Sequence, residues 1–271
     1  MLRSLAIAFS MYSKIPVPQF DWEERDMRFV MAFFPLVGLV IGLGEMLLLT
    51  LAHRLSLPRL PLALLLLLLP ILISGAIHLD GFMDTSDALH SYREREDKIR
   101  ILKDPHTGAF AVISFVCLLI FALAAACILL ESFDTTGQFY TLAILDPGGK
   151  KALPGAVAGI FWLSRILSAL SVLTFSPMSG EGTVASFAEA ADRKKVLLLL
   201  ILQLILASLW ILILGGIPGL FVLIAGGASF FYYYWKSGRE FGGINGDLAG
   251  WFVSYSEVAM ALSAGLVSLF L

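Results

Sequence analysis

Residues 60–79 read LPLALLLLLLPILISGAIHL, and this stretch decides the class of fold. A helix of about 20 predominantly apolar residues is long enough to cross the hydrocarbon core of a bilayer. The stretch has that length and contains no Lys, Arg, Asp or Glu. It therefore predicts a membrane-spanning helix.

The rest of the chain has the same character. Of its 271 residues 58% are apolar and 15% are charged, and the mean hydropathy is +0.86. Soluble domains average about 45–50% apolar and about 25% charged residues. Apolar surface on this scale would aggregate in water, so the composition excludes an ordinary soluble enzyme and a disordered chain. It predicts an all-α, polytopic integral membrane bundle, with residues 1–271 forming one membrane-embedded catalytic domain.

Apolar segments of spanning length recur along the chain. Met1–Met11 is too short to cross a bilayer, so we expect it to be buried or interfacial. The residue types favour helices over a barrel, because long period-2 alternation is missing from the sequence. We expect about seven transmembrane helices, at Arg28–Ala52, Leu60–Leu79, Gly108–Leu130, Ala152–Leu173, Val196–Leu214, Ile217–Trp235 and Leu248–Leu271.

The basic residues predict the orientation of these spans, since cytoplasmic loops collect Lys and Arg. With seven spans, 14 basic residues fall on the side of the N-terminus. The opposite side receives 4, which are Arg54, Arg59, Lys150 and Lys151. The N-terminus is thus predicted inside, in a multi-pass protein of the cytoplasmic (inner) membrane, with its polar loops and active site facing the cytoplasm. The net charge of −2 gives no indication of a nucleic-acid partner.

An acidic cluster follows the second span directly. Asp80, Asp84 and Asp87 are spaced i, i+4, i+7, which places them on one face of a helix. Three stacked carboxylates repel one another unless a cation lies between them, and Mg²⁺ prefers oxygen ligands. The spacing therefore indicates a metal site. The alternative is a solvated acidic helix start that complements the helix dipole.

Two further polar segments are candidates for the same site. Lys103 and Asp104 precede the third span, and Asp104 is a further candidate ligand. Before the last span, the Gly-rich loop offers Gly242, Gly243 and Asn245 as a phosphate cradle, followed by Asp247 as another metal ligand. The loop is equally well explained as a turn.

Arg165 and Glu257 are charged residues that fall well inside predicted spans. A guanidinium at membrane depth needs a partner, which an anionic phosphate or a carboxylate would supply. The first alternative makes Arg165 a phosphate-binding residue, and the second makes the two residues a structural pair.

The motifs resemble those of a known family. HLDGFMDTSD at 78–87, followed by ILKDPHTGAF at 101–110, is similar to the signature of the adenosylcobinamide-GDP ribazoletransferases, the membrane cobalamin synthases. The similarity extends to 10–18, 33–42 and 241–247. One departure is the segment 105–107, where the family pattern has a sequence similar to Ser-Arg-Ile.

The resemblance implies the last step of cobalamin nucleotide-loop assembly. α-Ribazole or its 5′-phosphate attacks the phosphate of adenosylcobinamide-GDP, and GMP leaves, in an Mg²⁺-dependent reaction at the lipid bilayer. On this basis we expect Asp80, Asp84 and Asp87 to hold Mg²⁺, with Asp104 or Asp247 completing the site.

Further roles follow from the same expectation. Asp84 or Asp87 would alternatively accept the proton of the attacking hydroxyl, and Lys103 and Arg165 would contact phosphate oxygens. A homo-oligomer is compatible with the sequence. The alternatives are a CDP-alcohol phosphotransferase of lipid synthesis and, less favoured, a cation transporter.

Overall fold

The computed structural model describes residues 1–18, 21–132, 153–179 and 182–271, so Lys150 and Lys151 lie outside the described residues. The described residues form helices and their connecting segments, with one isolated bridge between Pro177 and Ile244. The predicted all-α class is therefore confirmed. In chain order the helices are α1 (Leu2–Tyr12), α2 (Glu24–Met27), α3 (Val30–Arg54), α4 (Arg59–Ser74), α5 (Ile77–His90), α6 (Arg95–Ile101), α7 (Ala109–Ser132), α8 (Leu153–Thr174), α9 (Thr183–Ala190), α10 (Arg193–Phe241) and α11 (Gly246–Ser268).

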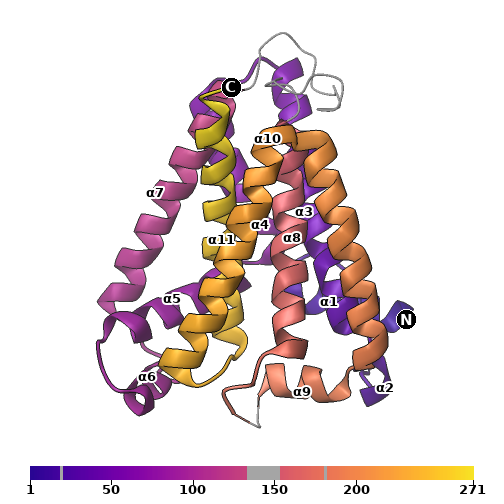
Figure 1. The fold of residues 1–271 in the computed structure, drawn as a ribbon, viewed down its shortest axis with the longest axis vertical. Coiled ribbons are helices and arrows are strands. Elements are labelled where there is room, and N and C mark those ends of the chain that lie inside the picture. Colours follow the sequence, from indigo (N-terminus) through magenta and orange to yellow (C-terminus); the bar gives the residue numbers. More distant parts are fainter. Residues whose placement is uncertain (19–20, 133–152, 180–181) are drawn as a thin grey trace.

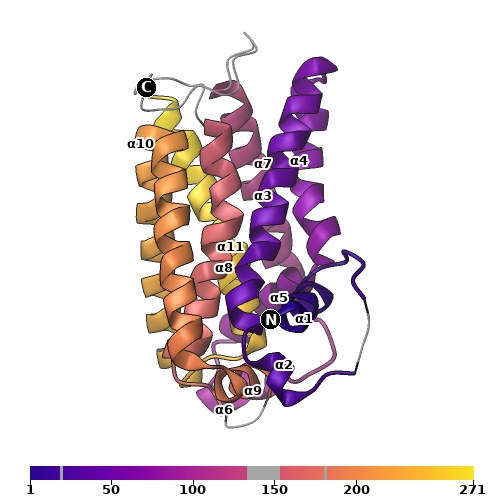
Figure 2. The same cartoon turned by 90° about the vertical axis from the view of Figure 1, so that its right-hand side faces the viewer.

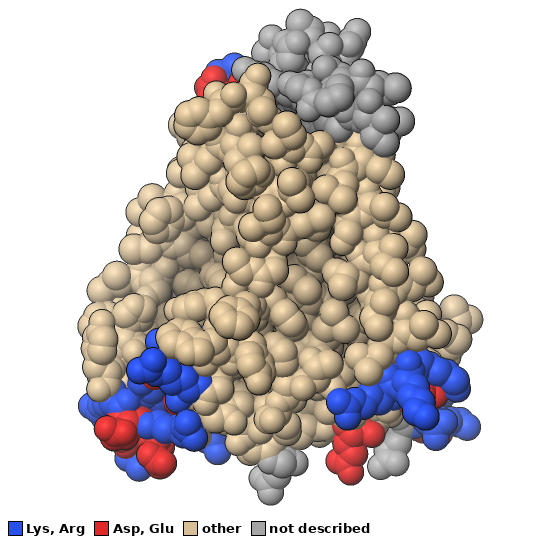
Figure 3. Space-filling model, in the orientation of Figure 1, with Lys and Arg blue, Asp and Glu red and all other residues tan. Residues whose placement is uncertain are grey.

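The surface of the bundle is suited to lipid. Figure 3 shows a wide uncharged band with charged side chains gathered mainly at one end. Large apolar side chains are exposed on the long helices, among them Leu68 of α4, Ile120 of α7 and Leu202 of α10. By length and composition four described helices can cross a membrane, namely α3, α7, α8 and α10, or up to five if the bent pair α4–α5 counts as one span. The chain is thus a multi-pass membrane protein, and the number of seven spans stays a prediction.

Helix α8 forms the centre of the bundle. It packs against α3, α10 and α11, and Figure 2 shows α8 and α3 between α10 on one side and α4 on the other. Gly38 and Gly42 of α3 allow the closest approach, because a Cβ built on them would lie 2.0 Å from the carbonyl oxygen of Phe161 and 2.1 Å from that of Ala158. Small residues at such crossings let membrane helices pack backbone to backbone.

Helix α10 consists of two arms that correspond to the predicted spans Val196–Leu214 and Ile217–Trp235. Gly216 interrupts the helix with φ 55° and ψ −130°, and the chain turns back on itself there (Figure 1). Gly219 lies at the inside of the turn, where a Cβ would be 2.2 Å from the carbonyl oxygen of Ile211. Glycine is required at 216 because L-residues rarely adopt this conformation.

The predicted span Leu60–Leu79 is broken, which corrects its expected bounds. Helix α4 ends at Ser74, and Gly75 and Ala76 both have left-handed backbones, with φ of 66° and 63°. Helices α4 and α5 meet at 96°, so α5 lies across the bundle rather than along it (Figure 1). The break could not be predicted from the hydropathy of the stretch, because the break arises from the backbone conformation of Gly75 and Ala76.

The N-terminal segment is partly buried: Ser4, Ile7 and Ala8 are buried, whereas Met1, Leu2 and Arg3 are exposed. Helix α1 spans Leu2–Tyr12 and buries Ile7 and Ala8, and it packs against α3. In Figure 1 the helices α2, α5, α6 and α9 gather at the end of the bundle opposite the C-terminus. The candidate site lies at that end.

Candidate active site

Helix α5 carries three of the predicted metal ligands. Asp80 is exposed, and Asp84 and Asp87 are half-buried. Other positions of the helix are buried, including Phe82 and Ala88, which belong to the main apolar core. Burial of these apolar side chains fixes which way the helix faces, and the aspartates are thereby left on the accessible side.

Helix α11 brings a fourth carboxylate to this face. Gly81 of α5 lies against Asp247, since a Cβ at position 81 would be 2.7 Å from the Asp247 carbonyl oxygen and 2.8 Å from its Cα. Asn245 begins α11, and its Oδ1 accepts a hydrogen bond from the N–H of Leu248 (2.9 Å). Its Nδ2 donates to Oδ2 of Asp247 (2.8 Å). Asn245 thus caps the helix and orients the Asp247 carboxylate.

Helix α7 completes the surroundings of Asp87. The backbone N–H of Ala111, in the first turn of α7, donates to Asp87 Oδ1 (3.3 Å). A carboxylate is favoured at the N-terminus of a helix. Gly108 lies under the same carboxylate, where a Cβ would be 2.1 and 2.2 Å from its two oxygens. Only glycine leaves room for Asp87 in this position.

Asp80, Asp84, Asp87 and Asp247, hereafter the aspartate cluster, act on one another electrostatically. Partial burial, and then the charges of Asp80, Asp247 and Asp87, raise the pKa of Asp84 to about 6. A set of carboxylate oxygens from two helices fits the ligand preference of Mg²⁺. Among the described residues no three His, Cys, Asp or Glu side chains are already grouped as ligands of one ion. A shared ion would therefore require side-chain rotation.

Lys103 and Asp104 lie in the turn after α6, and both are exposed. The backbone N–H of His106 donates to Asp104 Oδ1 (2.9 Å), and the His106 ring Nδ1 is 2.7 Å from the same oxygen. These hydrogen bonds lower the pKa of Asp104. Asp104 is not among the groups that shift the pKa of Asp84, and its role as a metal ligand stays a prediction.

The Gly-rich loop is held by backbone packing. Gly242 ends α10 with φ 78°, and a Cβ at Gly243 would lie 2.6 Å from the carbonyl oxygen of Ser176. The N–H of Ile244 donates to that oxygen (3.0 Å), and the N–H of Met178 donates to the Ile244 carbonyl (2.8 Å). These contacts suit the alternative that the loop is a turn, and phosphate binding by Gly242, Gly243 and Asn245 stays a prediction.

Arg165 and Glu257 form an ion pair inside the bundle. Arg165 is 2% exposed, and its Nη1 lies 2.5 Å from Glu257 Oε1 and donates to the carbonyl of Phe161 (3.0 Å). Ser164 Oγ donates to the same Glu257 oxygen (2.7 Å). The structure thus brings Arg165 together with Glu257 rather than with the aspartate cluster. A phosphate contact from Arg165 stays a prediction.

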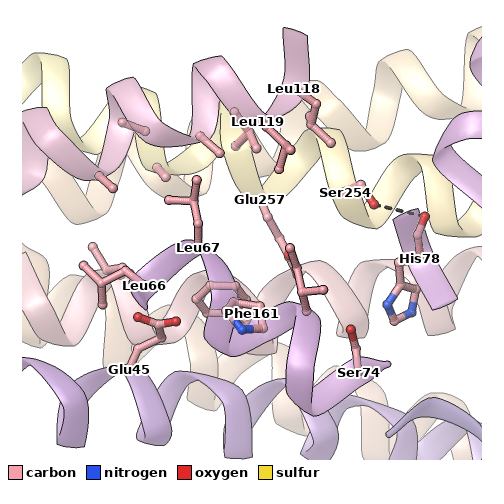
Figure 4. A pocket seen from close by; sticks show the side chains of 18 of the residues that line it. Glu45, Leu66, Leu67, Ser74, His78, Leu118, Leu119, Phe161, Ser254 and Glu257 are labelled. Carbon is pink, nitrogen blue, oxygen red and sulfur yellow. Dashed lines mark hydrogen bonds between the residues drawn. The ribbon is translucent and has the colours of Figure 1, made fainter. Parts of the chain in front are cut away.

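Sequence reasoning missed Glu45. This residue of α3 is 2% exposed, and it lines a cavity together with Arg165, Glu257 and His78 (Figure 4). Its Oε1 is buried without a hydrogen-bond partner. The signal was present, because an ionisable residue within an apolar span is rare and usually functional.

Comparisons with known proteins agree with the motifs. A family model described as Cobalamin-5-phosphate synthase matches residues 4–265. A protein of Lachnoclostridium phytofermentans named adenosylcobinamide-GDP ribazoletransferase is 38% identical over 97% of this chain and 93% of its own length. Proteins with the same name from Clostridium perfringens and Desulfitobacterium hafniense are 32% and 33% identical, over 98% and 97% of this chain and 98% and 96% of their own lengths. No solved structure matches this chain.

Proposed function

This chain belongs to the cobalamin-5-phosphate synthase family, and we propose that it joins adenosylcobinamide-GDP to α-ribazole, or to α-ribazole 5′-phosphate, with release of GMP. Membership makes the chain an enzyme of cobalamin synthesis, while these substrates and a dependence on Mg²⁺ belong to the proposal. The observation that carries it is the aspartate cluster, in which Asp84 is within electrostatic reach of Asp80, Asp87 and Asp247.

The aspartate cluster supplies the residues that would hold Mg²⁺. Asp80, Asp84 and Asp87 come from α5 and Asp247 from α11, with Asp104 a further candidate from the turn after α6. When bound, Mg²⁺ would neutralise charge on the pyrophosphate oxygens and on the departing GMP. The close contact at Gly81 keeps the two helices, and hence the carboxylates, in a fixed relation.

The chain's own side chains position the reactants and move the proton. A ribose hydroxyl of the nucleoside forms a bond to the phosphorus that carries cobinamide, and the bond from that phosphorus to GMP breaks. The hydroxyl proton passes to the carboxylate of Asp84 or Asp87, since a positioned carboxylate serves as general base. Lys103 is exposed at the same end of the molecule, and we assign it to unbridged phosphate oxygens.

The charge distribution supports a cytoplasmic location of the site. Basic side chains gather at the end of the bundle that carries α5, α6 and α9 (Figure 3). Loops rich in Lys and Arg stay on the cytoplasmic side during insertion. We therefore propose that the protein lies in the cytoplasmic membrane with the aspartate cluster facing the cytoplasm, where adenosylcobinamide-GDP and the nucleoside substrate are accessible.

The test is GMP release by the purified protein in lipid vesicles. With adenosylcobinamide-GDP, α-ribazole and Mg²⁺ we expect GMP and a cobalamin product in equal amounts, and we expect neither after chelation of the metal with EDTA. Restoring Mg²⁺ should restore both products. GMP release that is unaffected by EDTA would contradict the metal dependence.

Two parallel assays cover the alternative functions. A CDP-alcohol lipid substrate is supplied with an acceptor alcohol in one, and cation flux into the vesicles is followed in the other. A phospholipid product, or flux without GMP release, would overturn the proposal in favour of a lipid phosphotransferase or a transporter.

A further inference from the structure

A cavity of about 160 Å³ lies in the bundle between α3, α4, α5, α7, α8 and α11 (Figure 4). Most of its wall is aliphatic and includes Leu66, Leu67, Leu118 and Leu119. A wall of this kind accepts an apolar molecule in preference to a phosphate or a sugar. The apolar part of the wall therefore indicates the character of the occupant.

One side of the cavity is polar. Glu45, His78 and Arg165 line it, and each has a buried polar atom without a hydrogen-bond partner among the described residues: Oε1, Nε2 and Nε, respectively. All three side chains are at least nine-tenths buried. A buried polar atom left unpaired is unfavourable, so these atoms point to an occupant that offers hydrogen bonds.

The cavity adjoins the aspartate cluster. His78 and Leu79 line it, and Asp80 is the next residue of α5. Ser254 of α11 also lines the cavity and donates a hydrogen bond to the carbonyl of His78 (3.1 Å; Figure 4). The helices that carry the aspartates therefore also form part of this wall, and the cavity lies beside the segment of α5 that carries Asp80.

We infer that this cavity binds the aromatic base of the nucleoside substrate, an inference that rests on the proposed function. The base of α-ribazole is dimethylbenzimidazole, a flat bicyclic ring with apolar edges and one unsubstituted ring nitrogen that accepts a hydrogen bond. The aliphatic wall contacts the ring, and His78 Nε2 or Arg165 Nε donates to the nitrogen. The other substrate, adenosylcobinamide-GDP, is far too large and too charged for this space.

The variant Leu119→Trp tests the inference by filling the cavity. We expect the KM for α-ribazole to rise about tenfold, because the indole ring would occupy the space that the base fills, while the KM for adenosylcobinamide-GDP stays unchanged. The matched control is Ile120→Trp on the same helix, at a position that is 60% exposed and outside the cavity. We expect the control to leave both KM values unchanged.

A second measurement needs no variant. Free dimethylbenzimidazole should inhibit GMP release competitively against α-ribazole and not against adenosylcobinamide-GDP. An equal KM for α-ribazole in Leu119→Trp and wild type, or no competition by the free base, would overturn the inference. A lipid chain would then be the favoured occupant of the cavity.

Failure of the proposed function would be seen separately. Wild-type protein would then release no GMP at all, and direct binding of radiolabelled dimethylbenzimidazole to the protein in vesicles would still decide the cavity. Binding that Leu119→Trp abolishes and Ile120→Trp retains supports the inference. No binding to wild type, or equal binding to all three proteins, contradicts it.

Discussion

The aspartate cluster and the interior ion pair of Arg165 with Glu257 are both built from charged side chains on different helices, yet they balance their charge differently. The interior pair is matched within itself and hydrogen-bonded further to Ser164. None of the four aspartates of the cluster forms an ion pair with a described Lys, Arg or His.

This difference distinguishes the aspartate cluster, which can bind a cation, from the ion pair, which stabilises the bundle. Carboxylates that raise one another's pKa, as at Asp84, gain from an added cation. A buried pair that already contains its counter-ion gains nothing from another one and loses much if one partner is removed. We therefore expect substitutions in the cluster to affect chemistry without loss of stability, and substitutions in the pair to lower stability.

The largest expected effect comes from Asp84→Asn. The amide keeps the size of the side chain but removes the charge, and metal assistance is worth several kcal/mol. We expect GMP release to fall about 10³-fold, with normal expression and membrane insertion. Asp97→Asn is the matched control, since Asp97 pairs with Arg100 on the surface helix α6 and should cost less than about twofold. Near-normal turnover of Asp84→Asn with saturating Mg²⁺ would show that the ligand assignment is wrong.

The next effect is on stability, from Glu257→Leu. The change leaves the Arg165 guanidinium buried without its counter-ion, which costs about 3 kcal/mol, measured as the free energy of unfolding in detergent. The double variant Arg165→Met/Glu257→Leu replaces the pair by apolar groups and should recover most of that loss. A double variant as unstable as the single one would mean that the charge is not what destabilises it.

Much of the cluster was predictable from spacing. The i, i+4, i+7 positions of Asp80, Asp84 and Asp87 require one helical face, and α5 has that face. The apolar segments likewise predicted the long helices, because apolar runs of about 20 residues usually form membrane-spanning helices. The reversal between the two arms of α10 also fell at the predicted gap, at Gly216.

The remaining features depend on backbone geometry and on long-range packing, which the sequence pattern does not report. Nothing in the hydropathy distinguishes a break at Gly75 and Ala76 from a continuous helix, although that break turns α5 across the bundle. The contact of Gly81 with Asp247 joins residues far apart in sequence. Glu45 was visible as a charge within a span, but its place in the cavity depends on the packing of six helices.

A smaller effect is expected from Gly81→Ala, which tests whether the cluster depends on the α5–α11 contact. The added Cβ would collide with the backbone of Asp247, so the helices must separate, at a cost of about 1–3 kcal/mol. We expect GMP release to fall about tenfold, with a raised Mg²⁺ requirement. Gly227→Ala is the control, because a Cβ there meets nothing within 4 Å. Equal activity of the two variants would contradict the role of this contact.

The smallest expected effect comes from substitutions of Asn245, which distinguish the contributions of its two hydrogen bonds. Asn245→Ala removes the cap of α11 and the donor to Asp247, and loss of a cap costs about 1 kcal/mol. Asn245→Ser retains a capping oxygen but has no amide to hold the Asp247 carboxylate. We therefore expect both variants to need about fivefold more Mg²⁺ for half-maximal GMP release, while only Asn245→Ala loses thermal stability. If Asn245→Ser binds Mg²⁺ as wild type does, the hydrogen bond from the Asn245 amide to Asp247 is not needed for Mg²⁺ binding, and Asn245 acts only as the cap of α11.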